Sequence, residues 1–181
     1  MPKPTAGGKV GLLAGDKASA LGASGISPYY MGSIDFKDAA QIKRVLDYYE
    51  PLIVKELVEN AIIITRSGDI YHCTGTLNDL DTIVELGDKL RGAIVTHNHP
   101  IGSDNDYSFS LKDRYLFENY KLARLRGIDE KFIYELNRNS AFLDSEDDVV
   151  AGDEETFTNS HLRNIQLARF LGFGYRRWRH E

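Results

Sequence analysis

Cysteine is nearly absent from this sequence, since Cys73 is its one example in 181 residues. A lone cysteine cannot form an intramolecular disulfide, and it cannot build a zinc knuckle from thiolates. Cys73 lies in the apolar run I-Y-H-C, where we expect a small buried side chain. The cysteine count therefore excludes disulfide scaffolds and zinc sites made of thiolates.

Long apolar runs are also missing. No segment approaches the roughly 20 consecutive apolar residues that a membrane-spanning helix needs, and the first residues lack the apolar stretch of a secretion signal. We therefore expect an intracellular protein, cytoplasmic or carried on a larger particle, with no membrane partner.

An excess of positive charge is lacking as well, because the net charge is −5 and the isoelectric point is about 5.6. Such a balance gives the whole molecule no attraction to nucleic acid, which we do not expect as a partner. The basic C-terminal tail F-G-Y-R-R-W-R-H-E is interpreted as a solvated helix end on which Trp178 docks. Apolar residues make up 42% of the chain and charged residues 27%, which is typical of a globular protein.

The chain is predicted to hold one domain with additions at both ends. Residues 1–33, rich in Gly, Ala, Ser and Pro, are interpreted as a flexible N-terminal arm or linker. Residues 34–145 form the domain itself. Residues 146–181 supply an acidic loop and a C-terminal helix that packs on the domain.

Hydrophobic periodicity predicts an α/β domain, with a central mixed sheet flanked by helices. The expected helices lie near 35–50, with a kink or restart at Pro51 and a second piece over 54–60, then at 78–90, at 110–126 with Gly127 as its stop, and after 159. The expected strands cover 61–65, 70–73, 93–97, 132–136 and 141–143.

The segment T-H-N-H-P carries the first sign of chemistry, because His97 and His99 are separated by one residue. Alternate residues of a strand point to the same face, so the two imidazoles would face one ion. Pro100 marks the end of the strand, because proline cannot donate to a sheet ladder. Taken alone, the pair is equally compatible with a metal site and with a plain strand end.

A third ligand is available in S-L-K-D, where Ser110 suits a helix N-cap and Asp113 falls in the first turn. Two histidines and a carboxylate leave one zinc position open for water, as catalytic zinc sites require. The competing explanation needs no metal, because Ser-x-x-Asp also resembles a capping box.

Taken together, these motifs resemble the JAMM metallopeptidases, the MPN-domain family that includes deubiquitinating enzymes and bacterial RadC-like proteins. The resemblance runs from about Asp35 to Leu143 and is closest to the RadC-like branch. It rests on V-E-N-A-I-I-I-T-R-S-G-D, T-G-T-L-N, A-I-V-T-H-N-H-P, S-L-K-D and L-R-G-I-D. It implies a JAB/MPN-like, cytidine-deaminase-like fold.

The resemblance also implies roles for individual residues. His97, His99 and Asp113 would bind Zn2+, and Ser110 would hydrogen-bond the developing oxyanion. Glu59, just before A-I-I-I-T, would be the general base, with Glu56 as the alternative. Either glutamate is otherwise an exposed carboxylate at a helix end.

One spacing departs from the family pattern, because ten residues lie between His99 and Ser110, about three more than usual. If the longer loop fails to return Ser110 and Asp113 to the site, then Asp104 or Asp106 would ligate, or the site would be inactive. Ser108 is a weaker candidate for the oxyanion role, because no aspartate follows it three residues later.

The function implied is that of a zinc metallopeptidase or isopeptidase, hydrolysing an amide bond of a protein or peptide, ubiquitin-like proteins included, with a metal-activated water. One alternative is an inactive JAMM-fold module that binds or builds a larger assembly, and the lowest-ranked is a RadC-like role at DNA. His72 is expected to be a satisfied sheet residue, and His161 and His180 are expected on the surface.

Overall fold

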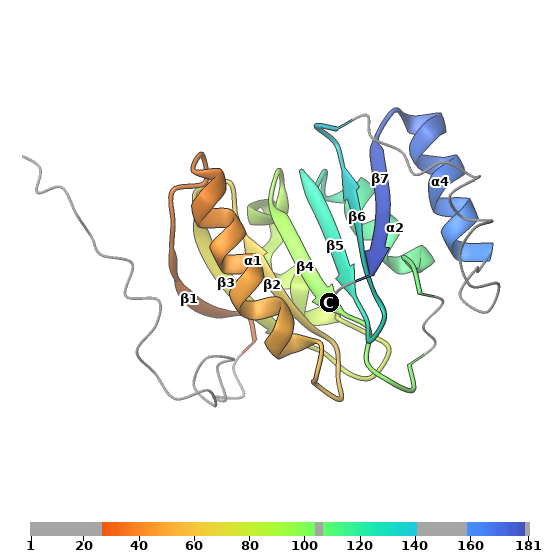
Figure 1. The fold of residues 1–181 in the computed structure, drawn as a ribbon. Coiled ribbons are helices and arrows are strands. Elements are labelled where there is room, and N and C mark those ends of the chain that lie inside the picture. The colour runs from red at the N-terminus through yellow and green to blue at the C-terminus, as the bar shows by residue number, and fades with distance from the viewer. Residues whose placement is uncertain (1–26, 104–106, 141–158, 180–181) are drawn as a thin grey trace, which may run out of the picture.

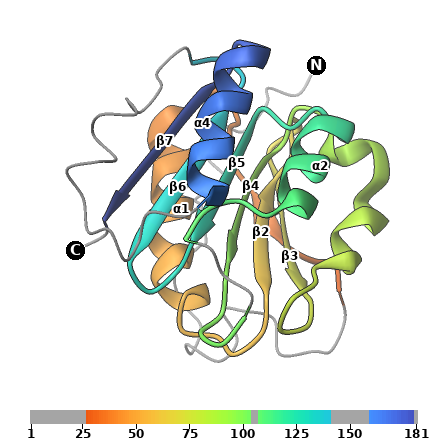
Figure 2. The same ribbon diagram turned by 90° about the vertical axis from the view of Figure 1, so that its right-hand side faces the viewer.

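The computed structural model describes residues 27–103, 107–140 and 159–179, which form a mixed β-sheet with helices on both faces (Figures 1 and 2). The strands are β1 (Tyr29–Ser33), β2 (Asn60–Ile64), β3 (Asp69–Thr74), β4 (Ile94–Asn98), β5 (Arg124–Ile128), β6 (Phe132–Asn137) and β7 (Gly174–Arg179). The helices are α1 (Ala39–Ile53), the 3-10 segment η1 (Asp81–Leu90), α2 (Leu111–Asn119) and α4 (Asn159–Leu171).

The strands lie in the order β1-β3-β2-β4-β5-β6-β7. Strands β4 and β5 are parallel, and every other neighbouring pair is antiparallel. Strand β4 is therefore central, and its residues are all buried. The predicted mixed sheet flanked by helices is confirmed.

Helix α1 covers one face of the sheet (Figure 1). It begins at Asp38, whose carboxylate accepts hydrogen bonds from the backbone N–H groups of Ala40 and Gln41, as an N-cap does. Its buried side chains recur every three or four residues, so one stripe of the helix meets the sheet. They pack with the isoleucines of β2 and β4 into the first core.

Segment η1 and helices α2 and α4 cover the opposite face, as Figure 2 shows for α2 and α4. The second core on this side joins Phe117 of α2 and Ile165 of α4 to Val95 of β4. A non-helical Gly87, with φ of 52°, separates two turns within η1. The face covered by these helices is the one that carries the candidate site.

Two helix predictions are wrong. The helix expected over 110–126 ends at Asn119, and Arg124–Ile128 forms strand β5 between β4 and β6. Gly127 is not a helix stop, because it lies within β5, where a Cβ would come within 2.1 Å of the ring of Tyr134. The second helical piece expected over 54–60 is also absent, since residues 54–59 form turns, bends and irregular backbone, and Asn60 begins β2.

The two ends of the domain were also misassigned. Tyr29–Ser33, placed in the flexible arm, is strand β1 and pairs with β3. The basic tail is strand β7, paired with β6, rather than a solvated helix end. The C-terminal helix is confirmed as α4, but the tail behind it completes the sheet. Residues 1–26, the strand expected at 141–143 and the acidic stretch 145–155 lie outside the described residues.

Within the described part of the chain, no helix has the length and apolar character needed to cross a membrane.

Candidate metal centre and active site

Strand β4 presents two histidines at its carboxyl end. His97 pairs with Ala61 of β2 and Gly127 of β5, and the His99 N–H donates to the carbonyl of Ile128 at 2.9 Å. The sheet therefore continues as far as His99, and Pro100 follows it. Both imidazoles are buried, with relative exposures of 2% and 7%, and both face the side covered by α2.

Asp113 reaches these imidazoles from the first turn of α2. Its Oδ1 lies 2.9 Å from Nε2 of His97, and its Oδ2 lies 3.4 Å from Nε2 of His99. The two Nε2 atoms lie 2.9 Å apart. Each of the three residues thus turns one ligand atom toward a common point. No other group of three or more His, Cys, Asp or Glu side chains in the described residues has this arrangement.

This donor set fits a zinc ion. Ligand atoms about 2.0–2.1 Å from a tetrahedral zinc ion lie roughly 3.3 Å from one another, close to the separations that His97, His99 and Asp113 show. Two imidazole nitrogens with one carboxylate oxygen are a borderline-soft set that suits zinc and related transition metals, whereas calcium and magnesium prefer oxygen ligands. Three protein ligands also leave one tetrahedral position for a reactant.

Tyr134 of β6 fixes the orientation of His99. Its hydroxyl lies 2.7 Å from Nδ1 of His99, and both side chains are buried. Burial raises the pKa of the Tyr134 phenol well above its ordinary value, so the phenol stays neutral. If Nε2 of His99 binds a metal, Nδ1 carries the proton and donates it to the Tyr134 oxygen. Gly127 makes this arrangement possible, because the Tyr134 ring occupies the place of a side chain there.

Asp113 combines two roles at the N-terminus of α2. Its Oδ2 accepts hydrogen bonds from the Ser110 N–H at 2.7 Å and the Ser110 Oγ at 2.6 Å, while the Asp113 N–H donates to Ser110 Oγ. The capping box expected from Ser-x-x-Asp is therefore present. Burial alone would raise the pKa of the Asp113 carboxyl, but the charges and hydrogen bonds of His97 and His99 hold it well below its ordinary value.

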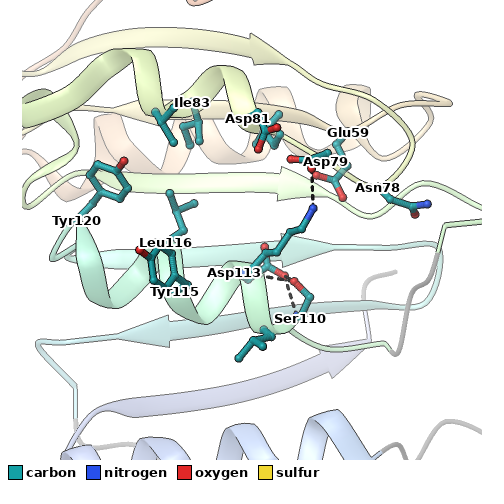
Figure 3. A pocket seen from close by; sticks show the side chains of 14 residues that line it. Glu59, Asn78, Asp79, Asp81, Ile83, Ser110, Asp113, Tyr115, Leu116 and Tyr120 are labelled. Atoms are coloured by element: carbon teal, nitrogen blue, oxygen red, sulfur yellow. Dashed lines mark hydrogen bonds and ion pairs between the residues drawn. The ribbon is translucent and has the colours of Figure 1, made fainter.

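Glu59 lines the same cleft as Ser110 and Asp113, whereas Glu56 does not. Figure 3 shows its side chain across the cleft from Asp113. Burial raises the pKa of the Glu59 carboxyl, and attraction from His97 and His99 opposes this rise without cancelling it. Glu59 and Asp113 therefore line one cleft, and the general-base role that the resemblance implies for Glu59 stays a prediction.

Asn98, between the two histidines, holds the segment that carries Glu59. Its Oδ1 accepts from the Asn60 N–H at 2.6 Å, and its Nδ2 donates to the Val58 carbonyl at 3.0 Å. The Asn60 side chain continues the network to His72, whose Nε2 lies 2.8 Å from Asn60 Oδ1. His72 is therefore the satisfied sheet residue that was predicted.

The long loop before Ser110 is anchored from the C-terminal part of the chain. Asn164 of α4 donates from Nδ2 to Ser108 Oγ at 2.7 Å and to the Phe109 carbonyl at 3.1 Å. The Tyr175 hydroxyl of β7 lies 2.7 Å from Ser108 Oγ and 2.8 Å from Nδ1 of His161. The Phe109 ring is fully buried beside Tyr175. This network determines where the loop enters α2.

The network changes two expectations. Ser108 is buried among these partners and is not part of the cleft lining, so it is unsuited to the oxyanion role. His161 is buried, not on the surface as predicted, because α4 turns it toward Tyr175. His180 and the alternative ligands Asp104 and Asp106 lie outside the described residues.

Three supporting residues escaped the sequence analysis: Tyr134, Asn98 and Asn164. The position of Asn98 could have indicated a role, since it stands between the two histidines with its side chain on the opposite face of the strand. Gly127 hinted at Tyr134, because a glycine inside a strand marks a close approach, but the segment was assigned to a helix. Nothing local to Asn164 indicates a partner 56 residues away.

Comparisons of the chain with protein families, with curated proteins and with solved structures return no match.

We expect Tyr134→Phe to bind zinc about 10- to 100-fold more weakly than the parent protein, because His99 loses the partner that orients it. Competition with a chromophoric chelator measures the affinity. Tyr71→Phe is the matched control, since the Tyr71 hydroxyl accepts from Lys89 and lies outside the cleft lining. Equal zinc affinity in Tyr134→Phe and the parent would contradict this role.

We also expect the fold to lose stability on mild acidification. Burial, followed by the positive charge of Arg177, lowers the pKa of His161 from 6.5 to about 3. At a pH between these values His161 is protonated in the unfolded chain but neutral in the folded protein. The free energy of unfolding therefore falls as the pH drops below 6.5. Chemical unfolding at pH 7 and pH 4.5 should show a pH-dependent loss that is smaller in His161→Gln by about 1–2 kcal/mol. An unchanged pH dependence in that variant would rule out the contribution of His161.

Proposed function

We propose that this protein is a zinc-dependent hydrolase of amide bonds with a JAMM-type site, acting on a protein or peptide substrate that can include ubiquitin-like proteins. The observation that carries the proposal is the convergence of His97, His99 and Asp113 on one point, with Glu59 across the cleft that Asp113 lines. Neither the capping box nor the strand end requires two buried imidazoles to face a partly buried carboxylate.

The chemistry that zinc supplies in such a site is Lewis acidity, which polarises a scissile carbonyl and makes water a stronger acid. His97, His99 and Asp113 would hold the ion, with Tyr134 orienting His99. Because Asp113 is a carboxylate, it also neutralises part of the charge of a divalent cation.

Glu59 is the residue placed to move the proton. Its carboxylate would accept a proton from the attacking water and deliver it to the leaving amine nitrogen, as general base and then general acid. The raised pKa of the Glu59 carboxyl makes the carboxylate a stronger base, which favours the first step. The hydrogen bonds of Asn98 hold the backbone on both sides of Glu59 in place for this task.

Ser110 is the candidate donor to the oxyanion. Its hydroxyl is exposed at the cleft and donates to Asp113 Oδ2 in the structure. Rotation about the side chain would redirect the hydroxyl to a substrate oxygen, while the Ser110 N–H keeps its bond to Asp113. A donor to the oxyanion typically contributes about 10²–10³ in rate when it is preorganised, and the rotation that Ser110 needs would reduce its contribution.

The competing proposal is a JAMM-fold module that binds without turnover. Two observations favour it: the Ser110 hydroxyl already donates to Asp113, and Lys112 extends across the cleft to Asp79. The RadC-like role at DNA still rests on one feature, the basic residues of the tail, which lie in the edge strand β7.

Metal analysis distinguishes whether Asp113 is a metal ligand or only a cap of α2. We expect about one zinc per chain in the parent and in Glu59→Gln, and none in His97→Ala or Asp113→Asn. Asparagine at 113 can still accept the capping hydrogen bonds but loses the anionic ligand oxygen. Asp88→Asn, an exposed carboxylate of η1, is the matched control.

Turnover then separates the enzyme from the binding module. Glu59→Gln should retain zinc and lose amide hydrolysis by about 10²–10⁴-fold. Equal zinc in the parent and Asp113→Asn would refute the ligand set. Zinc binding without hydrolysis by the parent on any peptide of a mixed library would favour the binding module.

A further inference from the structure

The cleft beside the candidate metal centre has one polar end and one apolar end. It encloses about 430 Å³, within the range of roughly 300–1,000 Å³ typical of ligand sites. Its polar end holds Glu59, Asp79, Ser110 and Asp113. The rest of its lining is largely apolar and comes from η1 and α2: Leu80, Ile83, Val84, Leu111, Tyr115, Leu116 and Tyr120.

The cleft runs along α2 from Asp113, away from the two histidines. Asp113, Leu116 and Tyr120 are spaced by three and four residues, so they share one face of the helix, and Figure 3 shows them in that order along the cleft. Seven residues of helix span about 10 Å, which is the length of roughly three residues of extended peptide. An extended substrate with its scissile amide at Asp113 would thus lay its neighbouring residues against Leu116 and Tyr120.

The apolar lining is accessible to a ligand. Val84 is 48% exposed and Tyr115 is 66% exposed, on the two opposite walls of the cleft. Burying such surface against an apolar side chain is favourable, at about 25 cal/mol per Å² removed from water.

The charges at the polar end select against acidic substrates. Glu59, Asp79 and Asp113 carry negative charge there, and Lys112 is the one basic residue among those that line the cleft. Its Nζ is engaged by Asp79 Oδ2 at 2.6 Å. Apart from the ion that the candidate ligands would hold, a substrate carboxylate in the cleft would therefore meet repulsion from Glu59 and Asp79 with no uncommitted basic side chain of the lining to offset it.

We propose that this cleft is the specificity site of the enzyme, resting on the function proposed above. It binds an extended peptide segment that places an aliphatic or aromatic side chain between Val84 and Tyr115, within about three residues of the scissile amide. Acidic residues in that segment are excluded.

Adding a negative charge to the apolar wall of the cleft tests the proposal. Three peptides that differ only in carrying Leu, Lys or Asp within this segment are compared as substrates of the parent, of Val84→Glu and of Phe170→Glu. Phe170 is 86% exposed on α4 and lies outside the cleft lining, so it is the matched control for an added glutamate. The zinc content of all three proteins is measured alongside.

The parent and Phe170→Glu should cleave the Leu peptide with a kcat/KM at least about tenfold above that for the Asp peptide. Val84→Glu should lose about tenfold or more on the Leu peptide and come to prefer the Lys peptide, with zinc content unchanged. A change of preference is a readout that a merely destabilised protein would not give. The same order of peptides in Val84→Glu and Phe170→Glu would overturn the proposal.

A binding measurement separates failure of the cleft from failure of the chemistry. The zinc-loaded Glu59→Gln protein is titrated calorimetrically with the Leu and Asp peptides, with and without Val84→Glu. Tighter binding of the Leu peptide, lost with Val84→Glu, supports the specificity site even if the parent hydrolyses nothing. Equal binding of the two peptides overturns it even if the parent is an active hydrolase.

Discussion

The site depends on one buried contact, that of the Asp113 carboxylate with the imidazoles of His97 and His99. A carboxylate taken out of water is costly unless charge or hydrogen bonds replace its hydration. Here the capping box supplies hydrogen bonds, and the two histidines supply either a shared proton or the ligands of a cation. The contact can form only if the N-terminus of α2 sits at the carboxyl end of β4. The candidate site is therefore complete only when α2 packs in this position.

The side chains of β4 alternate between the two faces of the sheet. Val95, His97 and His99 face α2, whereas Thr96 and Asn98 face the side of α1. Thr96 donates to the buried Glu50 of α1 at 2.9 Å. Glu50 also pairs with Arg126 at 3.0 Å, which links α1 to the neighbouring strand β5.

Burial raises the pKa of the Glu50 carboxyl, and Arg126 and Thr96 only partly offset this. A buried pair of this kind is costly to break, because removing one partner leaves the other charge without compensation. Thr96, on the α1 face of β4, therefore links the strand to α1 through Glu50. The histidines, on the α2 face, would hold the candidate metal. One five-residue strand carries both functions because its side chains alternate.

The C-terminal region is part of the site's support, although the family resemblance ends before it. The loop between His99 and Ser110 is longer than the resemblance leads one to expect, and a longer loop has more freedom to misplace Ser110 and Asp113. Asn164 and Tyr175 offset this freedom by binding Ser108 and the backbone of Phe109. Strand β7 and helix α4 thus replace the rigidity that a shorter loop would have.

The sequence by itself determined the features that depend on neighbours along the chain. The alternation in T-H-N-H-P placed two histidines on one face, and Ser-x-x-Asp predicted the cap that α2 has. The apolar β-branched run at 61–65 predicted the buried strand β2, and the three-to-four spacing of apolar residues predicted α1. These features follow from local geometry, so a single sequence is enough to show them.

Only the tertiary structure decided which remote residues meet. Residues 120–126 have good helix formers, yet Arg124–Ile128 is a strand because pairing with β4 and β6 and burial of Leu125 outweigh a propensity of a few tenths of a kcal/mol per residue. For the same reason Tyr29–Ser33 and Gly174–Arg179 are strands despite weak local patterns. Tyr134, Asn98 and Asn164 reach the site through contacts 35 to 56 residues apart in the chain. Such contacts arise from the burial of whole faces, which no short stretch of sequence encodes.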